Sequence, residues 1–119
     1  MNKRAIGAAK EELAAEYLMN KGYRIIGRNI RNKCGEIDII ALSPNGITVF
    51  VEVKYRSSDK YGDPAEAVDI RKIRKISKTA VSWMISVGKR DDLTCRFDVI
   101  ALYGDGHIKH IENAFPYTA

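Results

Sequence analysis

The chain has 119 residues, of which 45% are hydrophobic and 29% are charged, and its formal net charge is +5. This length suits one domain, which we expect to cover residues 1–119, and the composition excludes a wholly disordered chain. No apolar run approaches the roughly 20 residues that span a bilayer, and Glu11 and Glu12 follow the basic N-terminus too soon for a signal peptide. We therefore expect a cytoplasmic protein that does not contact membranes, and its basic charge favours an anionic partner such as nucleic acid.

Helices and strands alternate along the chain in an order that predicts an α/β domain with a mixed central sheet. A helix over residues 5–21 should end before Gly22, because glycine commonly follows a helix end. We expect strands over 24–29, 36–42 and 47–54, a loop over 57–63, a helix over 64–87 beginning at Pro64, and strands over 96–102 and 108–112.

The turn between the second and third expected strands sets their register. Pro44 and Asn45 suit the central positions of a type I turn, and Gly46 suits the left-handed residue that follows. A three-residue loop of this kind places Ser43 opposite Ile47, so that every pair of facing residues can be counted back from the turn.

Four charged residues then share one face of this hairpin, with Asp38 facing Glu52 and Glu36 facing Lys54. Two carboxylates so close together repel each other unless one is protonated or a cation lies between them. Mg²⁺ typically takes one or two carboxylates with water and substrate phosphate, and Lys54 lies close enough to contact such a phosphate. An ordinary charged ladder at the surface is the alternative, but a stability argument alone gives no reason to pair Asp38 with Glu52.

Glu11 lies on the small, apolar face of the first expected helix. Its neighbours on that face are Gly7, Ala14, Ala15 and Leu18, which suit close packing on a sheet. An inward carboxylate needs a metal or a lysine as its partner, whereas a carboxylate at the edge of the face can remain in water. Both interpretations of Glu11 remain open from the sequence.

Basic residues flank the charged end of the hairpin and are candidates for binding a nucleic-acid backbone. They are Arg28, Arg31 and Lys33 before it, and Arg56 and Lys60 after it. The second expected helix has a further basic face, formed by Arg71, Lys75 and Lys78, for which a solvated surface is the simpler interpretation.

The remaining candidates for metal or redox chemistry have simpler interpretations. His107 and His110 have no third ligand in the sequence and are expected at the surface. Cys34 and Cys95 are expected to be reduced thiols, since neither has a neighbour at metal-ligand spacing.

Six motifs are spread along the chain: Gly7…Glu11…Ala14, Gly35-Glu36-Ile37-Asp38, Phe50-Val51-Glu52-Val53-Lys54-x-Arg56, Gly62-x-Pro64, Ala67-Val68 with Lys72, and Arg96-Phe97-Asp98-Val99. Together they resemble the YraN-like family of predicted bacterial endonucleases. Glu52-Val53-Lys54, after an aspartate on the preceding strand, is also similar to the signature of the PD-(D/E)XK nucleases, which include archaeal Holliday junction resolvases. Two positions depart from these patterns: Ile37 stands where the signature has proline, and Lys10 where relatives often have glycine.

The resemblance implies a restriction-endonuclease-like core in the order α-β-β-β-α-β, with the mixed sheet flanked by helices. It implies an endonuclease that uses Mg²⁺ or Mn²⁺ to hydrolyse phosphodiester bonds in structured or branched DNA. Asp38 and Glu52 match the metal ligands of the family, and Lys54 matches its catalytic lysine. The other implied site residues are Glu11 and Glu36, as further ligands, and Lys72, as a basic residue that meets the substrate.

Two other functions fit the same sequence. A nucleic-acid-binding module could keep the nuclease fold without cutting, in which case it should bind DNA equally well in chelator. An accessory subunit of a DNA-processing complex should instead show an exposed apolar patch and weak affinity for nucleic acid. The oligomeric state is open, although a homodimer would suit an enzyme that makes two symmetric cuts.

Overall fold

The computed structural model describes residues 3–56, 68–88 and 94–119. Its elements are α1 (Lys3–Asn20), β1 (Arg24–Asn32), β2 (Gly35–Leu42), β3 (Thr48–Arg56), α2 (Ile70–Ser86), β4 (Cys95–Tyr103) and β5 (Ile108–Ile111). Their order confirms the predicted succession of helices and strands. Neither helix is long and apolar enough to cross a membrane, within the residues that the structure describes.

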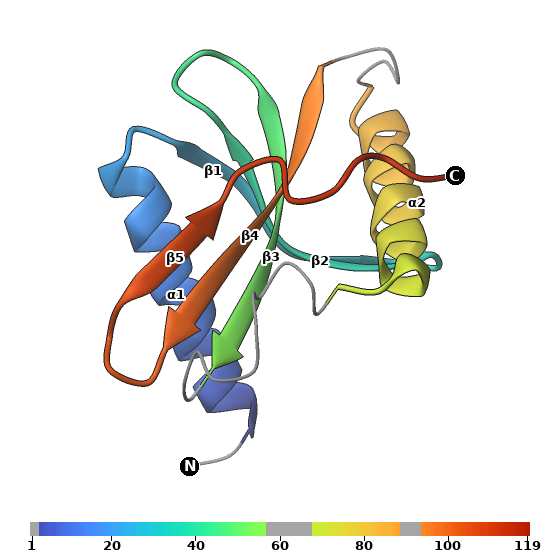
Figure 1. Ribbon diagram of the computed structural model, residues 1–119. Coiled ribbons are helices and arrows are strands. Elements are labelled where there is room, and N and C mark those ends of the chain that lie inside the picture. Colours follow the sequence, from blue (N-terminus) through green and yellow to red (C-terminus); the bar gives the residue numbers. More distant parts are fainter. Residues whose placement is uncertain (1–2, 57–67, 89–93) are drawn as a thin grey trace.

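The five strands form one mixed sheet in the order β1-β2-β3-β4-β5. All neighbours are antiparallel except β3 and β4, which pair in parallel along their whole length from Thr48↔Cys95 to Arg56↔Tyr103. A parallel pair cannot be joined by a tight turn, and α2 lies in the connection between these two strands (Figure 1). The mixed α/β sheet predicted from the sequence is therefore confirmed.

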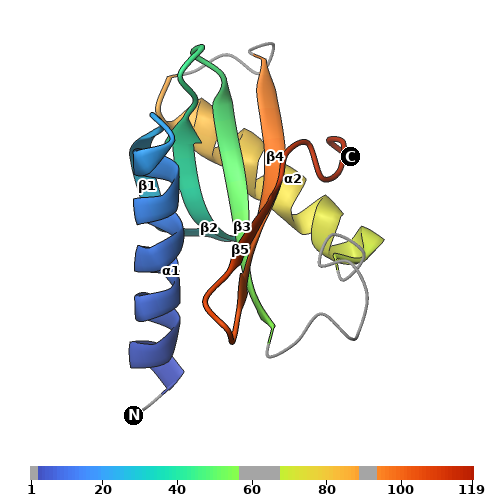
Figure 2. The ribbon, with the colours of Figure 1, turned by 60° about the vertical axis from the view of Figure 1, so that its left-hand side comes forward.

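The two helices lie on opposite faces of the sheet, and each helix covers its own apolar cluster (Figure 2). On one face Ala14, Ala15 and Leu18 of α1 are fully buried, and their small size lets the helix pack closely. On the other face α2 packs against the aromatic rings of β3 and β4, where Phe50 stacks on Phe97. Because both faces are covered, a charged group that projects from an inner strand needs a partner or must lie where the strand leaves this core.

The turn between β2 and β3 confirms the predicted register. The Ser43 N–H donates to the Ile47 carbonyl over 2.8 Å, and the Gly46 N–H donates to the Ser43 carbonyl over 2.9 Å. Gly46 has a φ of +87°, the left-handed conformation that this turn requires. The pairing of β2 with β3 then continues from Leu42↔Thr48 to Ile39↔Val51.

Beyond Ile39 the second strand leaves the third and bends toward α2 (Figure 1). The pairing of β1 with β2 continues to Asn32↔Gly35, so the end of this hairpin reaches α2 as a two-stranded arm. The bend also moves Ile37 into the cluster beneath α2, whereas Ile39 belongs to the cluster beneath α1. The prediction that strict alternation continues to Glu36, and places it opposite Lys54, is therefore wrong.

The predicted beginning of the second helix is also wrong over the residues that can be compared. Val68 and Asp69 are not helical, and α2 begins at Ile70. Asp69 caps the helix, because its side chain accepts a hydrogen bond of 2.9 Å from the Lys72 N–H. Pro64 and the loop predicted over 57–63 lie outside the described residues.

Candidate active site

Glu52 is the central acidic residue of the candidate site. It lies on β3 just past the point where β2 departs, and only 8% of its surface is exposed. Its Oε1 atom lies 2.6 Å from Lys72 Nζ on α2 and 3.6 Å from Lys54 Nζ on the same strand. A buried carboxylate is costly unless it is paired, and here two lysines from two elements pair with it.

Asp38 lies on β2 at the position where the backbone pairing with β3 has ended. Its Oδ2 atom accepts a hydrogen bond of 2.8 Å from the Val53 N–H. Because the β2–β3 pairing has ended, this side chain takes the place of a β2 backbone carbonyl as the acceptor. The divergence of the strands therefore positions the carboxylate between them and beside Glu52. Asp38 makes no ion pair with any residue in the described ranges.

Burial and neighbouring carboxylates both act on the pKa of Asp38. The pKa of Asp38 is raised from 3.8 to about 7, mainly by burial and then by the charges of Glu52 and Glu11, against the Val53 hydrogen bond and Lys72. Glu11 of α1 therefore belongs to the same electrostatic cluster as the two strand carboxylates. Around Asp38 itself two neighbouring carboxylates act against one lysine, and a cation would neutralise this local excess of negative charge.

The two lysines of the site differ in their electrostatic surroundings. Burial lowers the pKa of Lys54, and the neighbouring Lys72 and Arg56 lower it further despite the charge of Glu52. Burial also lowers the pKa of Lys72, but the hydrogen bond and charge of Glu52 outweigh this effect and the pKa is raised. Lys72 is thus held in its charged form by Glu52, whereas Lys54 is the lysine that loses its proton more readily.

Several residues predicted for the site lie elsewhere. Glu36 is exposed on the hairpin arm and pairs with Arg31 over 3.1 Å, so it does not contact Lys54. Arg28 pairs with Glu12 of α1 over 2.5 Å and therefore faces that helix. Arg56 ends β3 close enough to Lys54 to affect its pKa, and Lys60 lies outside the described residues.

The donor atoms of the site fit a hard divalent cation. Asp38 and Glu52 offer carboxylate oxygens, and one or two carboxylates with water are a common set of Mg²⁺ ligands. No group of three histidine, cysteine, aspartate or glutamate side chains is arranged to hold a metal within residues 3–56, 68–88 and 94–119. A cation here would therefore depend on two carboxylates together with water and substrate oxygens, which is how Mg²⁺ is usually held.

A second buried polar cluster, on the side of the sheet that α1 covers, is absent from the sequence interpretation. Asp98 is fully buried and accepts two hydrogen bonds from Arg96, of 2.8 and 2.9 Å, and one of 3.0 Å from the Asn113 N–H. His110 Nε2 lies 2.7 Å from Asp98 Oδ2, and only 2% of the His110 side chain is exposed. The prediction of a surface histidine is therefore wrong for His110, whereas His107 is exposed as expected.

One feature of the sequence could have predicted this cluster. Arg96 and Asp98 are two residues apart in an expected strand, which puts both side chains on one face of it. Burial raises the pKa of Asp98, but the hydrogen bonds from His110 and Arg96 outweigh it and the pKa is lowered. Cys34 and Cys95 are free thiols, as the sequence predicted.

Comparison with known proteins identifies close relatives along almost the whole chain. The profile of a family described as "Uncharacterised protein family UPF0102" matches residues 10–102. A UPF0102 protein of Trichlorobacter lovleyi is 50% identical over 115 residues, which cover 93% of this chain and 90% of that protein. UPF0102 proteins of Lachnoclostridium phytofermentans and Alkaliphilus oremlandii are 45% and 48% identical, and the matches cover 97% of this chain in both cases.

Proposed function

Because the chain belongs to the UPF0102 family, whose names state no activity, we propose its function from the geometry of the site: a metal-dependent endonuclease that hydrolyses phosphodiester bonds. The observation that carries this proposal is the pair of carboxylates at the divergence of β2 and β3. Asp38 has no ion pair with the residues that the structure describes, although Glu52 lies beside it and two lysines lie within 3.6 Å of Glu52. A site built for stability alone would avoid this excess of negative charge.

The fold is compatible with this proposal. The helix, three antiparallel strands, crossover helix and parallel strand follow the order of a restriction-endonuclease-like core. The motifs that resemble PD-(D/E)XK nucleases, Asp38 and Glu52-Val53-Lys54, meet at one end of the sheet. We infer from that resemblance that the substrate is structured or branched DNA.

Asp38 and Glu52 would hold Mg²⁺ or Mn²⁺, and the negative charge of Glu11, which acts on Asp38, would further favour a cation there. When bound, the ion supplies Lewis-acid polarisation of the scissile phosphate and a water of lowered pKa. The chain itself fixes the direction of Asp38 through the Val53 N–H and keeps the pair of carboxylates partly out of water.

The two lysines have separate roles in this proposal. Lys54 is 16% exposed in its side chain and projects beside Glu52, where it can orient a water molecule or stabilise the charge that develops on the phosphate. Lys72 is 43% exposed and neutralises Glu52 in the absence of other cations. It also lies at the edge of the site, where it can contact a phosphate oxygen of the incoming substrate.

The test is cleavage of labelled duplex, single-stranded, flap and four-way-junction DNA with Mg²⁺, with Mn²⁺ and with EDTA. Asp38→Asn, Glu52→Gln and Lys54→Met should each lower the cleavage rate by about 10²-fold or more, since each removes a group placed at the reacting phosphate. Glu12→Gln is the control, because Glu12 is an exposed acidic residue of α1 that pairs with Arg28 away from the site. Cleavage retained in all three site variants would refute the proposal.

A second candidate function is a nucleic-acid-binding module that does not cut. One observation favours it: Lys72 and Lys54 together already balance the charge of Glu52 without a metal. Such a protein, whether it acts alone or as an accessory subunit, would bind DNA with the same affinity in Mg²⁺ and in EDTA and would cleave none of the substrates.

A further inference from the structure

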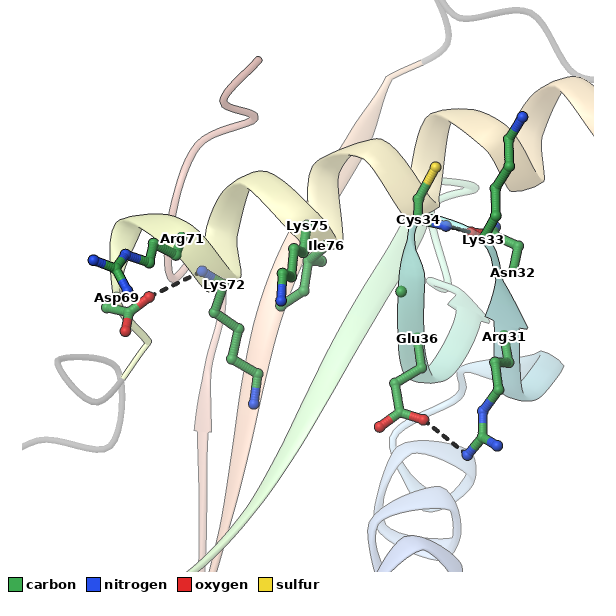
Figure 3. Close-up of a pocket in the computed structure, with 11 residues that line it drawn as sticks. Arg31, Asn32, Lys33, Cys34, Glu36, Asp69, Arg71, Lys72, Lys75 and Ile76 are labelled. Carbon is green, nitrogen blue, oxygen red and sulfur yellow. Dashed lines mark hydrogen bonds and ion pairs between the residues drawn. The ribbon is translucent and has the colours of Figure 1, made fainter.

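A cavity of about 790 Å³ lies in the corner between the β1–β2 arm and α2 (Figure 3). Residues 31–36 of the arm form one wall, and the first turns of α2, including Arg71, Lys72 and Lys75, form the other. Ile76 provides apolar surface between the two walls. Neither Asp38 nor Glu52 lines the cavity, but Lys72 belongs both to its lining and to their site.

The two walls are held together by direct contacts, so the cavity exists before any ligand binds. Asn32 Nδ2 donates a hydrogen bond of 3.4 Å to the Thr79 carbonyl, which fastens the tip of the arm to α2. Gly35 lies so close to α2 that a Cβ atom in its place would be 3.0 Å from Thr79 Oγ1. A preformed cavity avoids the cost of ordering its walls when a ligand binds.

The walls carry an excess of positive charge. The cationic residues that line the cavity are Arg31, Lys33, Arg71, Lys72 and Lys75, against the two acidic residues Glu36 and Asp69. Glu36 is paired with Arg31, and Asp69 is bonded to the first turn of α2 as its cap. Lys33, Arg71 and Lys75 make no ion pair within the parts of the chain that the structure describes, so their charges are available to an anion.

Lys72 connects this cavity to the candidate active site. It lines the cavity, and its Nζ atom lies 2.6 Å from Glu52 Oε1. In Figure 3 its side chain extends from α2 into the same space as the side chain of Glu36 on the arm. A phosphate held by Lys72 and Lys75 would therefore have a neighbouring phosphate within reach of the carboxylates.

From these observations we propose that the corner between the β1–β2 arm and α2 binds a single strand of nucleic acid by its phosphates and leads it to Glu52. The volume is that of a small-ligand pocket, roughly 300–1,000 Å³, which suits one or two nucleotides. A space of this volume has no room for a duplex, whose major groove alone is about 12 Å wide. The proposal rests on the proposed function for the reaction that follows, but the binding step can be measured without any cleavage.

The test is the binding of a short, fluorescently labelled single strand, in EDTA, over a series of salt concentrations. Arg71→Ala/Lys75→Ala should weaken binding about tenfold and lower the slope of log K against log[salt] by about 1.4, or 0.7 for each lost phosphate contact. The matched control is Arg74→Ala/Lys78→Ala, which removes the same charge from exposed positions of the same helix that do not line the cavity. This control should change the affinity less than twofold.

One further variant and one further ligand complete the test. Arg71→Lys/Lys75→Arg keeps both charges and should retain the affinity, which would exclude misfolding as the cause of the loss. The same oligonucleotide as a duplex should bind more weakly and should respond equally little to both double alanine variants. An equal loss in the cavity and control variants, or tighter binding of the duplex with the same loss, would overturn the proposal.

The outcome is independent of whether the protein cuts. If the protein cleaves DNA but binds single strands equally well after Arg71→Ala/Lys75→Ala, the proposed function stands and the proposed binding site is wrong. If the protein never cleaves but shows the expected loss of affinity, the proposed binding site stands and the proposed function is wrong.

Discussion

Asp38 should make the metal-free protein less stable than it would be with a neutral side chain at this position. The carboxylate is partly buried beside Glu52 and Glu11 and has no cation partner among the described residues. Asp38→Asn removes the charge but retains an oxygen that can accept the hydrogen bond from the Val53 N–H. We therefore expect this substitution to stabilise the protein while it abolishes cleavage, as is common at functional sites.

The magnitude and the pH window follow from the raised pKa. Between pH 3.8 and about 7 the folded protein binds a proton at Asp38 that the unfolded chain has released, so the wild type loses stability as the pH rises through this window. At 1.36 kcal/mol per pKa unit, the whole interval corresponds to an upper bound of roughly 4 kcal/mol. For a chain of this length that is a rise in melting temperature of up to about 16 °C for Asp38→Asn above neutral pH.

The assay is urea unfolding of both proteins in chelator at about pH 4 and about pH 8.5, with Glu36→Gln as the exposed control. The stability gain of Asp38→Asn should be small at the lower pH and largest at the higher one. Addition of Mg²⁺ at the higher pH should then stabilise the wild type more than Asp38→Asn, because only the wild type has both carboxylate ligands. A variant that is no more stable than the wild type at high pH would refute this account of the site.

Three further predictions concern the framework of the site, and each is measured by denaturant or thermal unfolding. Asp98→Ala should cost about 3–5 kcal/mol, because it leaves the partly buried Arg96 with only the more distant Glu112, at 3.9 Å, as an acidic partner. Asp105→Ala at the exposed turn should leave the melting temperature unchanged, and similar effects of the two would contradict the buried network. Gly35→Ala should cost about 1–3 kcal/mol because its Cβ would press on Thr79 Oγ1, and more than Gly46→Ala, which has a positive φ but open space around it. Lys72→Met should cost about 1–3 kcal/mol by leaving Glu52 with only the more distant lysine, and Glu52→Gln added to it should recover most of this loss; strict additivity of the two changes would argue against their contact.

The hairpin at the centre of the site could be predicted because its determinants are local. Pro44, Asn45 and Gly46 specify one turn type, and that turn fixes the register of every pair up to Ile39↔Val51. The pairing of Asp38 with Glu52 in one site follows from this register. The position of Lys72 in the site could not be derived in the same way, because it depends on how α2 packs across the sheet.

The errors come from features that depend on distant parts of the chain. The bend of β2 toward α2, which removes Glu36 from the site, is set by the contacts of the arm with Thr79 and not by the alternation of residues in the strand. The burial of His110 depends on Asp98, which lies on a different strand. The beginning of α2 was missed because Pro64 is a good first helical residue, although Asp69 is the better cap.

The parallel pairing of β3 and β4 has a consequence for the order of folding. The three N-terminal strands are joined by short turns, so they can pair early, whereas β4 can join them only after α2 has crossed the sheet. Glu52 and Lys72 belong to β3 and to the crossover helix, so their contact should be among the last to form. Trp83, the one tryptophan, packs edge-on against Phe50 at 5.9 Å and would report this docking step by its fluorescence during refolding. If the protein is the endonuclease proposed above, this signal and Mg²⁺-dependent cleavage should return together during refolding, and a chain released before β4 is made would lack a working site.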